Sequence, residues 1–448
     1  MELIFLCGIA VLAFTTLYDT CSAFRTVRFL SSGSNCTPPL VSGPPSSSFC
    51  ILIPALSEQE RLPDTLDYLM SCSLPWNTKI VIITTEKEGC DVRPTTGEVV
   101  EAYIQSKDHG SISRVHYPNS NGWMAHQLNY AIRQLIETEA LRPDDVIALY
   151  NADSRPHPLT FVAVEKLMKD DTGVAVVQQS AIFLKNYLDI RDWIARADAL
   201  YQSYWTLVHE ITRIRSLSKQ GFLSKILATH CVGHGLFIRV KALQEVGYFP
   251  EDTVTEDSFL GFLLNSHGIA VHSLPLLEGA DAPSSWRAVA RQKYVWFFGP
   301  LCYPLYLFLF YRSHRELKLS LVKPILFALH GATRAVRWIG KGPLIIALVA
   351  YAATVHQQSL IYISIIIGLW TIYAMGPVVF LYGCRGVMKR ATGHTIQFPK
   401  QSPRNLLKMC GAALVYPALH SLPPFLSIFA LLKKITFETA IAKPKTED

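Results

Sequence analysis

The hydrophobic positions divide the chain into regions of different periodicity. From Phe49 to about Tyr294, short apolar runs rich in β-branched residues alternate with segments whose apolar residues recur at helical spacing. This alternation predicts an α/β domain with a mostly parallel sheet covered by helices. The clearest predicted strands are Cys50 to Ile53, Lys79 to Thr84, Val146 to Tyr150 and Val174 to Gln178, and the clearest helices are Ser57 to Ser71 and Ala125 to Glu139.

Longer apolar segments flank this region. Pro343 to Val355 and Leu360 to Tyr382 have the composition of membrane helices, and Met409 to Leu432 is a third segment that its prolines should kink or make re-entrant. Two shorter segments, Phe297 to Tyr311 and Leu321 to His330, are flanked by basic residues. They fit an amphipathic position at the membrane surface as well as a span.

The apolar run from Leu3 to Tyr18 has no basic residue before it and is followed by Arg25 and Arg28. This order favours an uncleaved anchor and places the following residues in the cytosol. We therefore expect an integral membrane protein, of the plasma membrane, whose α/β domain lies in the cytosol. The expected division is an anchor at 1–24, a linker at 25–48, the α/β domain at 49–296, interfacial and transmembrane helices at 297–432, and a polar tail at 433–448.

Composition supports contact with membrane lipids. Half of the residues are hydrophobic and 17% are charged, below the about 25% that is usual in soluble domains. The net charge of +7 comes from Lys and Arg that lie beside apolar segments, which argues for lipid headgroups and against nucleic acid. Lipid-facing and partner-facing apolar helices have the same composition, so no oligomeric state is predicted.

The first candidate for chemistry is Asp153, in Tyr150-Asn151-Ala152-Asp153 after a predicted strand. Carboxyl ends of strands are where α/β sheets bind ligands. A departing nucleoside diphosphate needs its charge neutralised there, and a carboxylate that holds Mg²⁺ or Mn²⁺ would do so. Asp153 is therefore the predicted metal ligand. The alternative is a simple turn, because Asn, Asp and Ser are common turn residues.

The second candidate is the acidic pair Glu256 and Asp257 at the start of a predicted helix. Acids are common at helix starts because they interact with the helix dipole. The functional interpretation is that Asp257 accepts the proton of an attacking hydroxyl, a role worth about 10² to 10⁴ in rate. Glu256 would support the same loop.

Two further segments carry candidates. Trp296, in Gln292-Lys293-Tyr294-Val295-Trp296, could stack on a sugar, or it could anchor the chain at the membrane surface. His230-Cys231-Val232-Gly233-His234-Gly235 contains possible zinc ligands, but its spacing matches no familiar zinc pattern. The glycines fit a close approach of backbone to a ligand better.

Taken in order, these motifs resemble the membrane-bound members of glycosyltransferase family 2, which include cellulose, chitin and hyaluronan synthases. The similarity covers residues 49 to about 300. It begins with Ile51-Leu52-Ile53-Pro54-Ala55 and continues through Gly122 to Asn129, Asn151-Ala152-Asp153, Gly233-His234-Gly235, Thr255-Glu256-Asp257 and Gln292 to Trp296.

The resemblance implies a GT-A fold and an inverting transfer from a nucleotide-sugar donor to a polysaccharide or lipid-linked acceptor. It assigns Asp257 as general base, Asp153 as ligand of Mg²⁺ or Mn²⁺, and the remaining motif residues to donor or acceptor. The donor set is Pro54, Glu58, Glu86, Asn151 and Asp153, and the acceptor set is Gly233, His234, Gly235, Gln292 and Trp296.

Four places depart from the family pattern, one of them being Trp123 and Met124, which occupy a region where the family often has Lys. Thr84-Thr85-Glu86 replaces the acid that contacts the nucleotide base, Asn151 replaces the first acid of Asp-x-Asp, and Val295 replaces an Arg that meets phosphate. These departures imply a changed donor pocket. They also leave a second interpretation open, in which the protein has this fold but serves in binding or assembly and catalyses no reaction. A transporter is the third class, but its path would need charges inside the membrane, which the predicted spans almost lack.

Overall fold

A seven-stranded sheet forms the centre of the α/β region. The computed structural model describes residues 2–33, 48–89, 93–107, 110–219, 221–313, 321–355, 359–394, 396, 398 and 402–437. In the order in which they neighbour one another, the strands are β3 (Ile112–Tyr117), β2 (Lys79–Thr85), β1 (Phe49–Pro54), β4 (Val146–Leu149), β7 (Leu236–Arg239), β5 (Val176–Gln178) and β8 (Val271–Ser273).

Only β7 of this sheet runs against its neighbours, pairing antiparallel with both β4 and β5. The other pairs are parallel, with Cys50 opposite Lys79 and Phe49 opposite Val146. The predicted mostly parallel α/β sheet is therefore confirmed. A second, two-stranded parallel sheet joins β6 (Ala181–Ile182) to β9 (Glu278–Gly279).

Both faces of the large sheet are buried. Leu52 and Ile147 point to one face, into a cluster with residues of α4 and α9, while Ile51 and Ile53 point to the other, toward α2 and α5. Successive strand residues face opposite sides, so continuous apolar runs are what a doubly covered sheet requires.

The helices of this region are α2 (Leu62–Ser71), α3 (Thr96–Lys107), α4 (Met124–Glu137), α5 (Thr160–Asp170), α6 (Trp193–Trp205), α7 (Ile211–Ser218), α8 (Val240–Glu245) and α9 (Glu256–Ser266), with short turns η1 (Glu86–Glu88) and η3 (Phe222–Lys225) and the π-helical turn η2 (Thr206–Glu210).

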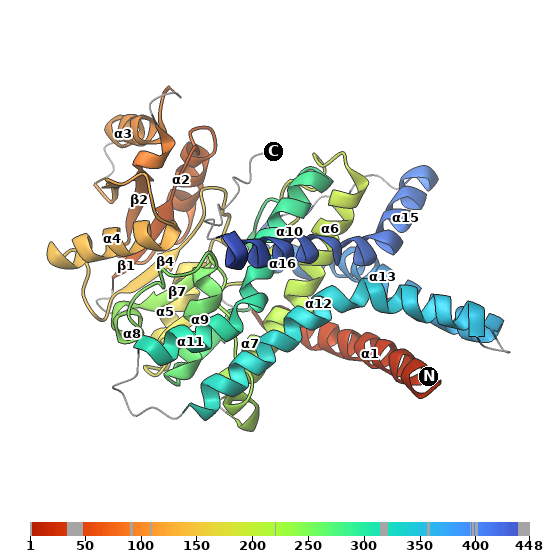
Figure 1. Cartoon of the computed structure of the whole chain (residues 1–448). Helices are drawn as coiled ribbons and strands as arrows, with labels where there is room; N and C mark the ends of the chain where they lie inside the picture. The colour runs from red at the N-terminus through yellow and green to blue at the C-terminus, as the bar shows by residue number, and fades with distance from the viewer. Residues whose placement is uncertain are drawn as a thin grey trace.

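Long helices extend away from the sheet on one side of the molecule, where α1, α12 and α13 project together (Figure 1). Among the residues that the structure describes, four helical segments are long and apolar enough to cross a membrane, and there are five if the bent pair α10 and α11 counts as one span. The protein is thus an integral membrane protein. The four segments are α1 (Glu2–Gly33), α12 (Val322–Val355), α13 (Ser359–Gly383) and the pair α15 (Pro403–Leu419) with α16 (Leu422–Phe437). The bent pair is α10 (Trp286–Leu301) with α11 (Tyr303–Ser313), and the short helix α14 (Arg385–Thr392) follows α13.

The helix α1 continues to Gly33, past the expected end of the anchor at residue 24. Its second half packs on the α/β region: Ala23 and Leu30 are buried, and the Thr26 hydroxyl donates to the Leu207 carbonyl at 2.6 Å. Because these contacts are with residues distant in sequence, the local pattern did not reveal them. Residues 34–47 of the expected linker and 438–448 of the expected tail lie outside the described residues.

Two expected segments join or divide differently in the structure. Leu321 to His330, expected as a separate short segment, is almost entirely the first part of α12. Met409 to Leu432 comprises most of α15 and α16, which meet at His420 and Ser421. The Trp338 indole donates to the His420 carbonyl at 3.0 Å, so this break is held against α12.

Candidate active site

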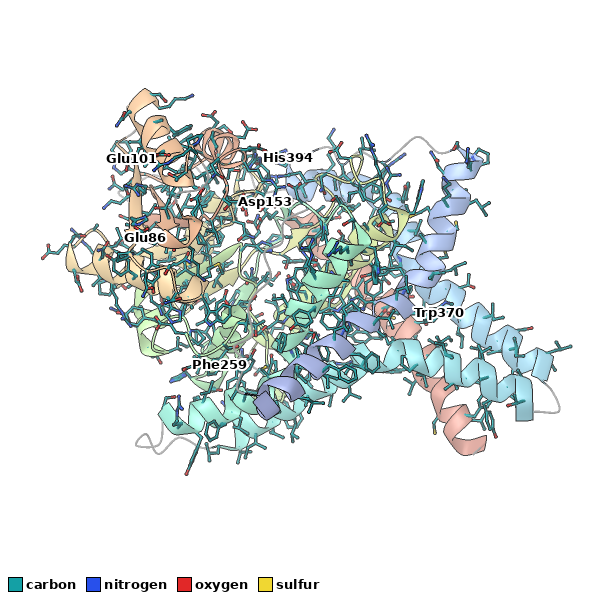
Figure 2. All side chains as sticks on the ribbon, turned by 45° about the horizontal axis from the view of Figure 1, so that its top comes forward. Glu86, Glu101, Asp153, Phe259, Trp370 and His394 are labelled. Carbon is teal, nitrogen blue, oxygen red and sulfur yellow. The ribbon has the colours of Figure 1, made fainter. Side chains whose placement is uncertain are left out.

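A cavity of about 1620 Å³ lies where the carboxyl ends of the central strands meet the long helices. Asp153, three residues after the buried Tyr150 that follows β4, lines it, and so does Asp257 in the first turn of α9. In the view of Figure 2, Asp153 lies near the boundary between the α/β region and the helices. The structure therefore brings both acids, which are far apart in sequence, to one hollow larger than the about 300–1,000 Å³ of most small-molecule sites.

The Asp153 end of the cavity is rich in acids. The Lys185 ammonium donates to the Asp153 carbonyl at 2.8 Å and lies 3.2 Å from a carboxylate oxygen of Asp281. Burial, reinforced by Asp153, raises the pKa of Glu58 to about 7. Burial also raises the pKa of the Asp281 carboxyl, with Lys185 opposing the rise and Asp153 adding to it. The negative charge of Asp153 therefore acts on both of these carboxyls, and a bound cation would offset it.

The residues present fit a divalent metal shared with a substrate. Within the described part of the chain, no group of three or more His, Cys, Asp or Glu residues has the arrangement of a complete metal site. Mg²⁺ is usually held by one or two carboxylates together with substrate phosphates and water. The acid-rich surroundings of Asp153 match that kind of partial site.

The segment between the two acids requires glycine at position 235. Gly235 has a φ of +62°, and a Cβ there would lie 2.5 Å from the Gln179 carbonyl oxygen and 3.1 Å from a carboxylate oxygen of Glu278. The Gln179 amide in turn donates to the Gly235 carbonyl at 2.7 Å. Only a residue without a side chain fits such a close approach of two backbones.

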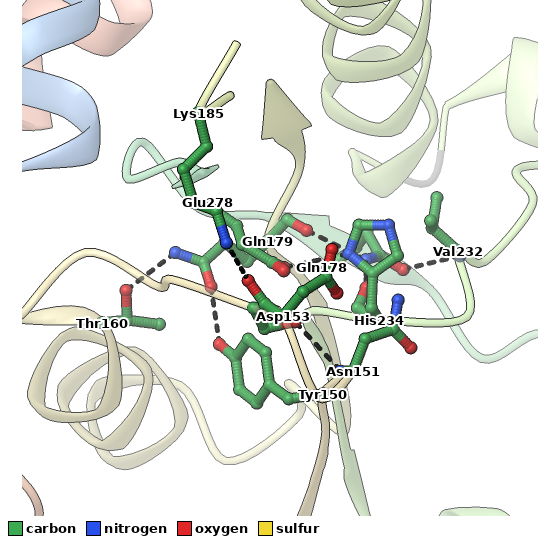
Figure 3. Close-up of polar contacts among 11 residues, drawn as sticks. Tyr150, Asn151, Asp153, Thr160, Gln178, Gln179, Lys185, Val232, His234 and Glu278 are labelled. Atoms are coloured by element: carbon green, nitrogen blue, oxygen red, sulfur yellow. Dashed lines mark hydrogen bonds and ion pairs between the residues drawn. The ribbon is translucent and has the colours of Figure 1, made fainter. Parts of the chain in front are cut away.

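His234 and Glu278 form a buried ion pair beside this turn, as Figure 3 shows. The His234 Nδ1 lies 2.9 Å from a Glu278 carboxylate oxygen. Burial by itself lowers the pKa of His234, but Glu278, Asp153 and Glu210 together raise it to about 9. At neutral pH the imidazole is therefore a cation facing the acid-rich end of the cavity.

Asp257 lies on the other side of the same turn. A Cβ on Gly233 would be 3.6 Å from an Asp257 carboxylate oxygen, and the other oxygen accepts from the Ser258 amide at 2.6 Å. Glu256 is 4% exposed and also lines the cavity. Gly233 thus borders Asp257, and the charge of Asp153 acts on the next residue, His234, so this one turn interacts with both acids.

Gln292 and Trp296 face the cavity from α10. The Lys293 ammonium lies 4.3 Å from the centre of the Trp296 ring, and the centres of the Phe183 and Trp296 rings are 5.9 Å apart. Lys293 itself is buried and pairs with Asp198 of α6 at 3.1 Å. The indole is thus held in place within the cavity wall, as a ring that stacks on a sugar would have to be.

The predicted donor residues divide into two groups. Pro54, Glu58 and Asn151 line the cavity with Asp153. Glu86 is not among the described residues that line it: its carboxylate pairs with His116 at 2.9 Å and is largely exposed. Glu86 follows β2 and pairs with His116 of β3, and it lies apart from Asp153 in Figure 2.

Sequence reasoning missed four polar residues of this site, namely Gln179, Lys185, Glu278 and Asp281. A signal for two of them existed: Glu278-Gly279-Ala280-Asp281 places two acids and a glycine directly after the apolar run Leu274 to Leu277. Lys185 and Gln179 had no comparable signal, because each lies in a short irregular segment whose neighbours come from elsewhere in the chain.

Comparison with known proteins identifies the class. A model of "Glycosyl transferase family group 2" matches residues 146–383, more than half of the chain. The chain belongs to this family, and the resemblance inferred from the motifs is confirmed.

Individual relatives are distant. The probable glucomannan 4-beta-mannosyltransferase 1 of Arabidopsis thaliana is 23% identical over 251 residues, which are 56% of this chain and 42% of that protein. Among solved structures, the mannosyltransferase PcManGT from Pyrobaculum calidifontis, in complex with GDP-Man and Mn²⁺, is 15% identical with a TM-score of 0.50 and covers 93% of this chain and 99% of its own. S. aureus TarS in complex with UDP-GlcNAc is 10% identical with a TM-score of 0.40 over 83% of this chain and 90% of that chain. The likeness to PcManGT confirms the predicted GT-A type of fold.

Proposed function

We propose that this protein is an inverting mannosyltransferase that transfers mannose from GDP-mannose to a hydroxyl of a membrane-associated acceptor. The observation that carries the proposal is the shared cavity, which Asp153, Asp257 and Trp296 line together. The proposed donor, GDP-mannose, is based on two similar proteins, a mannosyltransferase in complex with GDP-Man and a probable glucomannan mannosyltransferase.

Asp257 is the proposed general base. Its carboxylate lies beside Gly233, across the turn from the acid-rich end where the diphosphate would bind. An acceptor hydroxyl held near Asp257 would lose its proton to that carboxylate while its oxygen attacks the anomeric carbon. Attack opposite to the departing diphosphate inverts the anomeric centre.

Asp153 would hold a divalent cation together with the donor diphosphate, and the cation would supply positive charge to the leaving group. His234 is the chain's own cation at this place, because it is protonated at neutral pH and interacts with Asp153. Fixed positive charge aimed at a developing anion lowers the barrier without reorganisation. Trp296 and Gln292 would orient the acceptor.

We also propose that the α/β region faces the cytosol. Arg25 and Arg28 follow the apolar half of α1, and Lys389 and Arg390 end α14, which packs near the α/β region through Leu277. Excess Lys and Arg close to the ends of spans marks the cytosolic side.

The test is nucleotide release by the purified full-length protein with GDP-mannose and Mn²⁺. Asp257→Asn should lower the rate about 10²- to 10⁴-fold while donor affinity stays within about twofold, since the carboxylate acts only as the hydroxyl attacks. Asp252→Asn is the matched control: Asp252 is in the same loop, exposed, and 4.0 Å from Arg312. Equal rates for Asp257→Asn and wild type would exclude this general base.

Two further results decide between the proposal and a binding protein without chemistry. Asp153→Ala should abolish the dependence of donor affinity on Mn²⁺ in calorimetry, and an unchanged dependence would refute the metal assignment. If the wild-type protein binds donors but releases nucleotide from none of the common nucleotide sugars, the binding protein is the better description.

A further inference from the structure

The cavity does not end at the catalytic acids. It continues between α1 and α12, where its walls are apolar and include Val11 and Phe14 of α1 and Leu344 and Leu348 of α12. Both helices are long and apolar enough to span a membrane. A groove with aliphatic walls inside spanning helices fits an alkyl chain better than a polar polymer.

The two helices run antiparallel, which fixes where this apolar groove ends. A Cβ on Gly8 would lie 2.7 Å from the Leu348 side chain, and the Phe5 and Tyr351 rings have centres 5.0 Å apart. Asp19 is eleven residues from Gly8 on α1, and Arg337 is eleven residues from Leu348 on α12. Both therefore lie about 16 Å along their helices from this contact, toward the α/β region. The groove therefore becomes polar at one common level.

A cluster of three arginines marks that level: Arg213 of α7 and Arg334 and Arg337 of α12 all line the cavity. Arg334 donates to the Tyr303 hydroxyl at 3.3 Å, and Arg213 lies 3.4 Å from a ring nitrogen of His230. Within the described residues, no carboxylate oxygen lies within 4.0 Å of any of the three guanidinium groups. Burial, and next the charge of Arg334, lowers the pKa of Arg213 to about 9, so the positive charges of Arg213 and Arg334 act on each other.

Two buried acids share the hollow with the arginines, although neither forms an ion pair with them within 4.0 Å. Asp19 lies 3.3 Å from a ring nitrogen of His209, and Glu210 lies 3.9 Å from one of His230. His209 and Glu210 belong to the π-helical turn η2, a distortion that often accompanies functional sites, and both line the cavity. Three arginines against these two acids leave a surplus of positive charge in the hollow.

The cluster is close to the catalytic acids. His230, which contacts Arg213, is three residues before Gly233, which borders Asp257. Three residues span at most about 10 Å of extended chain. A group bound by the arginines would therefore lie only a short distance from the general base. A short glycan would bridge that distance.

We propose that the arginine cluster binds the phosphate of a lipid acceptor whose alkyl chain lies between α1 and α12. The reacting hydroxyl would then belong to the lipid's own short headgroup glycan and would reach Asp257 along the 230–233 segment. This inference rests on the proposed function, of which it names the acceptor class. The charge complements phosphate, which Arg binds through paired hydrogen bonds.

The test uses the full-length protein in detergent micelles and follows fluorescence of the tryptophans that line the cavity, among them Trp205 and Trp338. The probes are phytanyl phosphate, phytanol and inorganic phosphate. We expect phytanyl phosphate to bind at least tenfold more tightly than either of the other two. The double variant Arg334→Gln with Arg337→Gln should weaken phytanyl phosphate about 10- to 100-fold and leave phytanol unchanged, because only charge-assisted bonds are removed.

Lys323→Gln is the control variant: Lys323 is a basic residue of the same helix, exposed, and outside the cavity lining. It should bind phytanyl phosphate as wild type does. Arg337→Gln alone, with an expected loss of about tenfold, keeps the inference testable if the double variant melts at a much lower temperature. Equal affinities for phytanol and phytanyl phosphate, or equal losses in the Lys323 and arginine variants, would overturn the phosphate site.

Two other results would overturn the lipid acceptor. Inorganic phosphate that binds as tightly as phytanyl phosphate would make this a site for free anions. Faster GDP release with soluble manno-oligosaccharides, and none with a phytanyl diphosphate-linked sugar, would point to a polysaccharide acceptor. Failure of the proposed function looks different: donor binding and nucleotide release would be absent while the arginine-dependent lipid binding persisted.

Discussion

Replacing Gly235 with alanine separates the backbone conformation at the site from its close packing. Two costs add at this position. A non-glycine residue at a φ of +62° costs about 1–2 kcal/mol, and the new Cβ would lie 2.5 Å from the Gln179 carbonyl oxygen, an overlap that costs about 1–3 kcal/mol more. Because the obstructing atom belongs to the backbone, it cannot rotate away. The expected destabilisation is about 2–5 kcal/mol.

Two control variants separate these costs: Gly247→Ala tests the positive φ alone, and Gly261→Ala tests the close packing alone. Gly247 has a φ of +84°, but nothing lies within 4 Å of its Cβ position, whereas a Cβ on Gly261 would lie 2.6 Å from the Cys231 amide nitrogen without a positive φ. Gly247→Ala should therefore lower the melting temperature by roughly 2–8 °C, and Gly235→Ala by more.

The functional readout of Gly235→Ala is transfer activity in the fraction that stays folded. The added Cβ would lie 3.1 Å from Glu278, so it should displace the His234 ion pair and lower the transfer rate at least about tenfold, while Gly247→Ala leaves the rate unchanged. Melting temperature and rate are measured on the same preparations. If Gly235→Ala loses no more stability than Gly247→Ala and keeps full activity, the packing argument is wrong.

Three more predictions concern the surroundings of the site. Lys293→Met should cost about 3–5 kcal/mol because it leaves Asp198 buried without its cation, and adding Asp198→Leu should restore much of the melting temperature. In the ligand-free protein, the pKa of Glu58 is raised, so the Glu58 carboxyl contributes stability below about pH 4.5 and this contribution is lost as the pH rises toward 7. The melting temperature of Glu58→Gln should therefore depend less on pH over this range than that of the wild type. Trp296→Ala should abolish transfer with donor affinity retained, and calorimetry showing the reverse would make Trp296 a donor contact or a membrane anchor.

Local sequence patterns predicted the sheet well because its strands are buried on both faces. The observed strand β1 extends the predicted Cys50 to Ile53 by one residue at each end, and β2 extends Lys79 to Thr84 by one. Such strands appear as continuous apolar runs whatever their neighbours are. Strand β3 was not predicted, because at the sheet edge its residues Ser113 to Tyr117 are only partly buried and mostly polar or aromatic.

The candidate site was only partly accessible from sequence. Asp153 and Asp257 were chosen because each occupies a position where local structure exposes a carboxylate, after a strand or at a helix start. Glu86 was chosen from the family resemblance, as a substitute for the acid that follows the second strand, but its side chain pairs with His116 and is not among the described residues that line the cavity. A position at a strand end predicts at which edge of the sheet a residue lies, but it does not predict the direction of the side chain.

The sequence by itself determined the class of protein: an α/β domain with the motifs of a glycosyltransferase, joined to helices that only a membrane accommodates. Those features depend on composition and short-range order, which neighbouring residues carry. The tertiary structure decided which polar groups share one hollow. It joined His234 to Glu278, placed Arg213 of α7 beside Arg334 of α12, and carried α1 past its expected end onto the α/β region. Charges in such groups act over distances of a few ångströms in space, and no spacing along the chain records those distances.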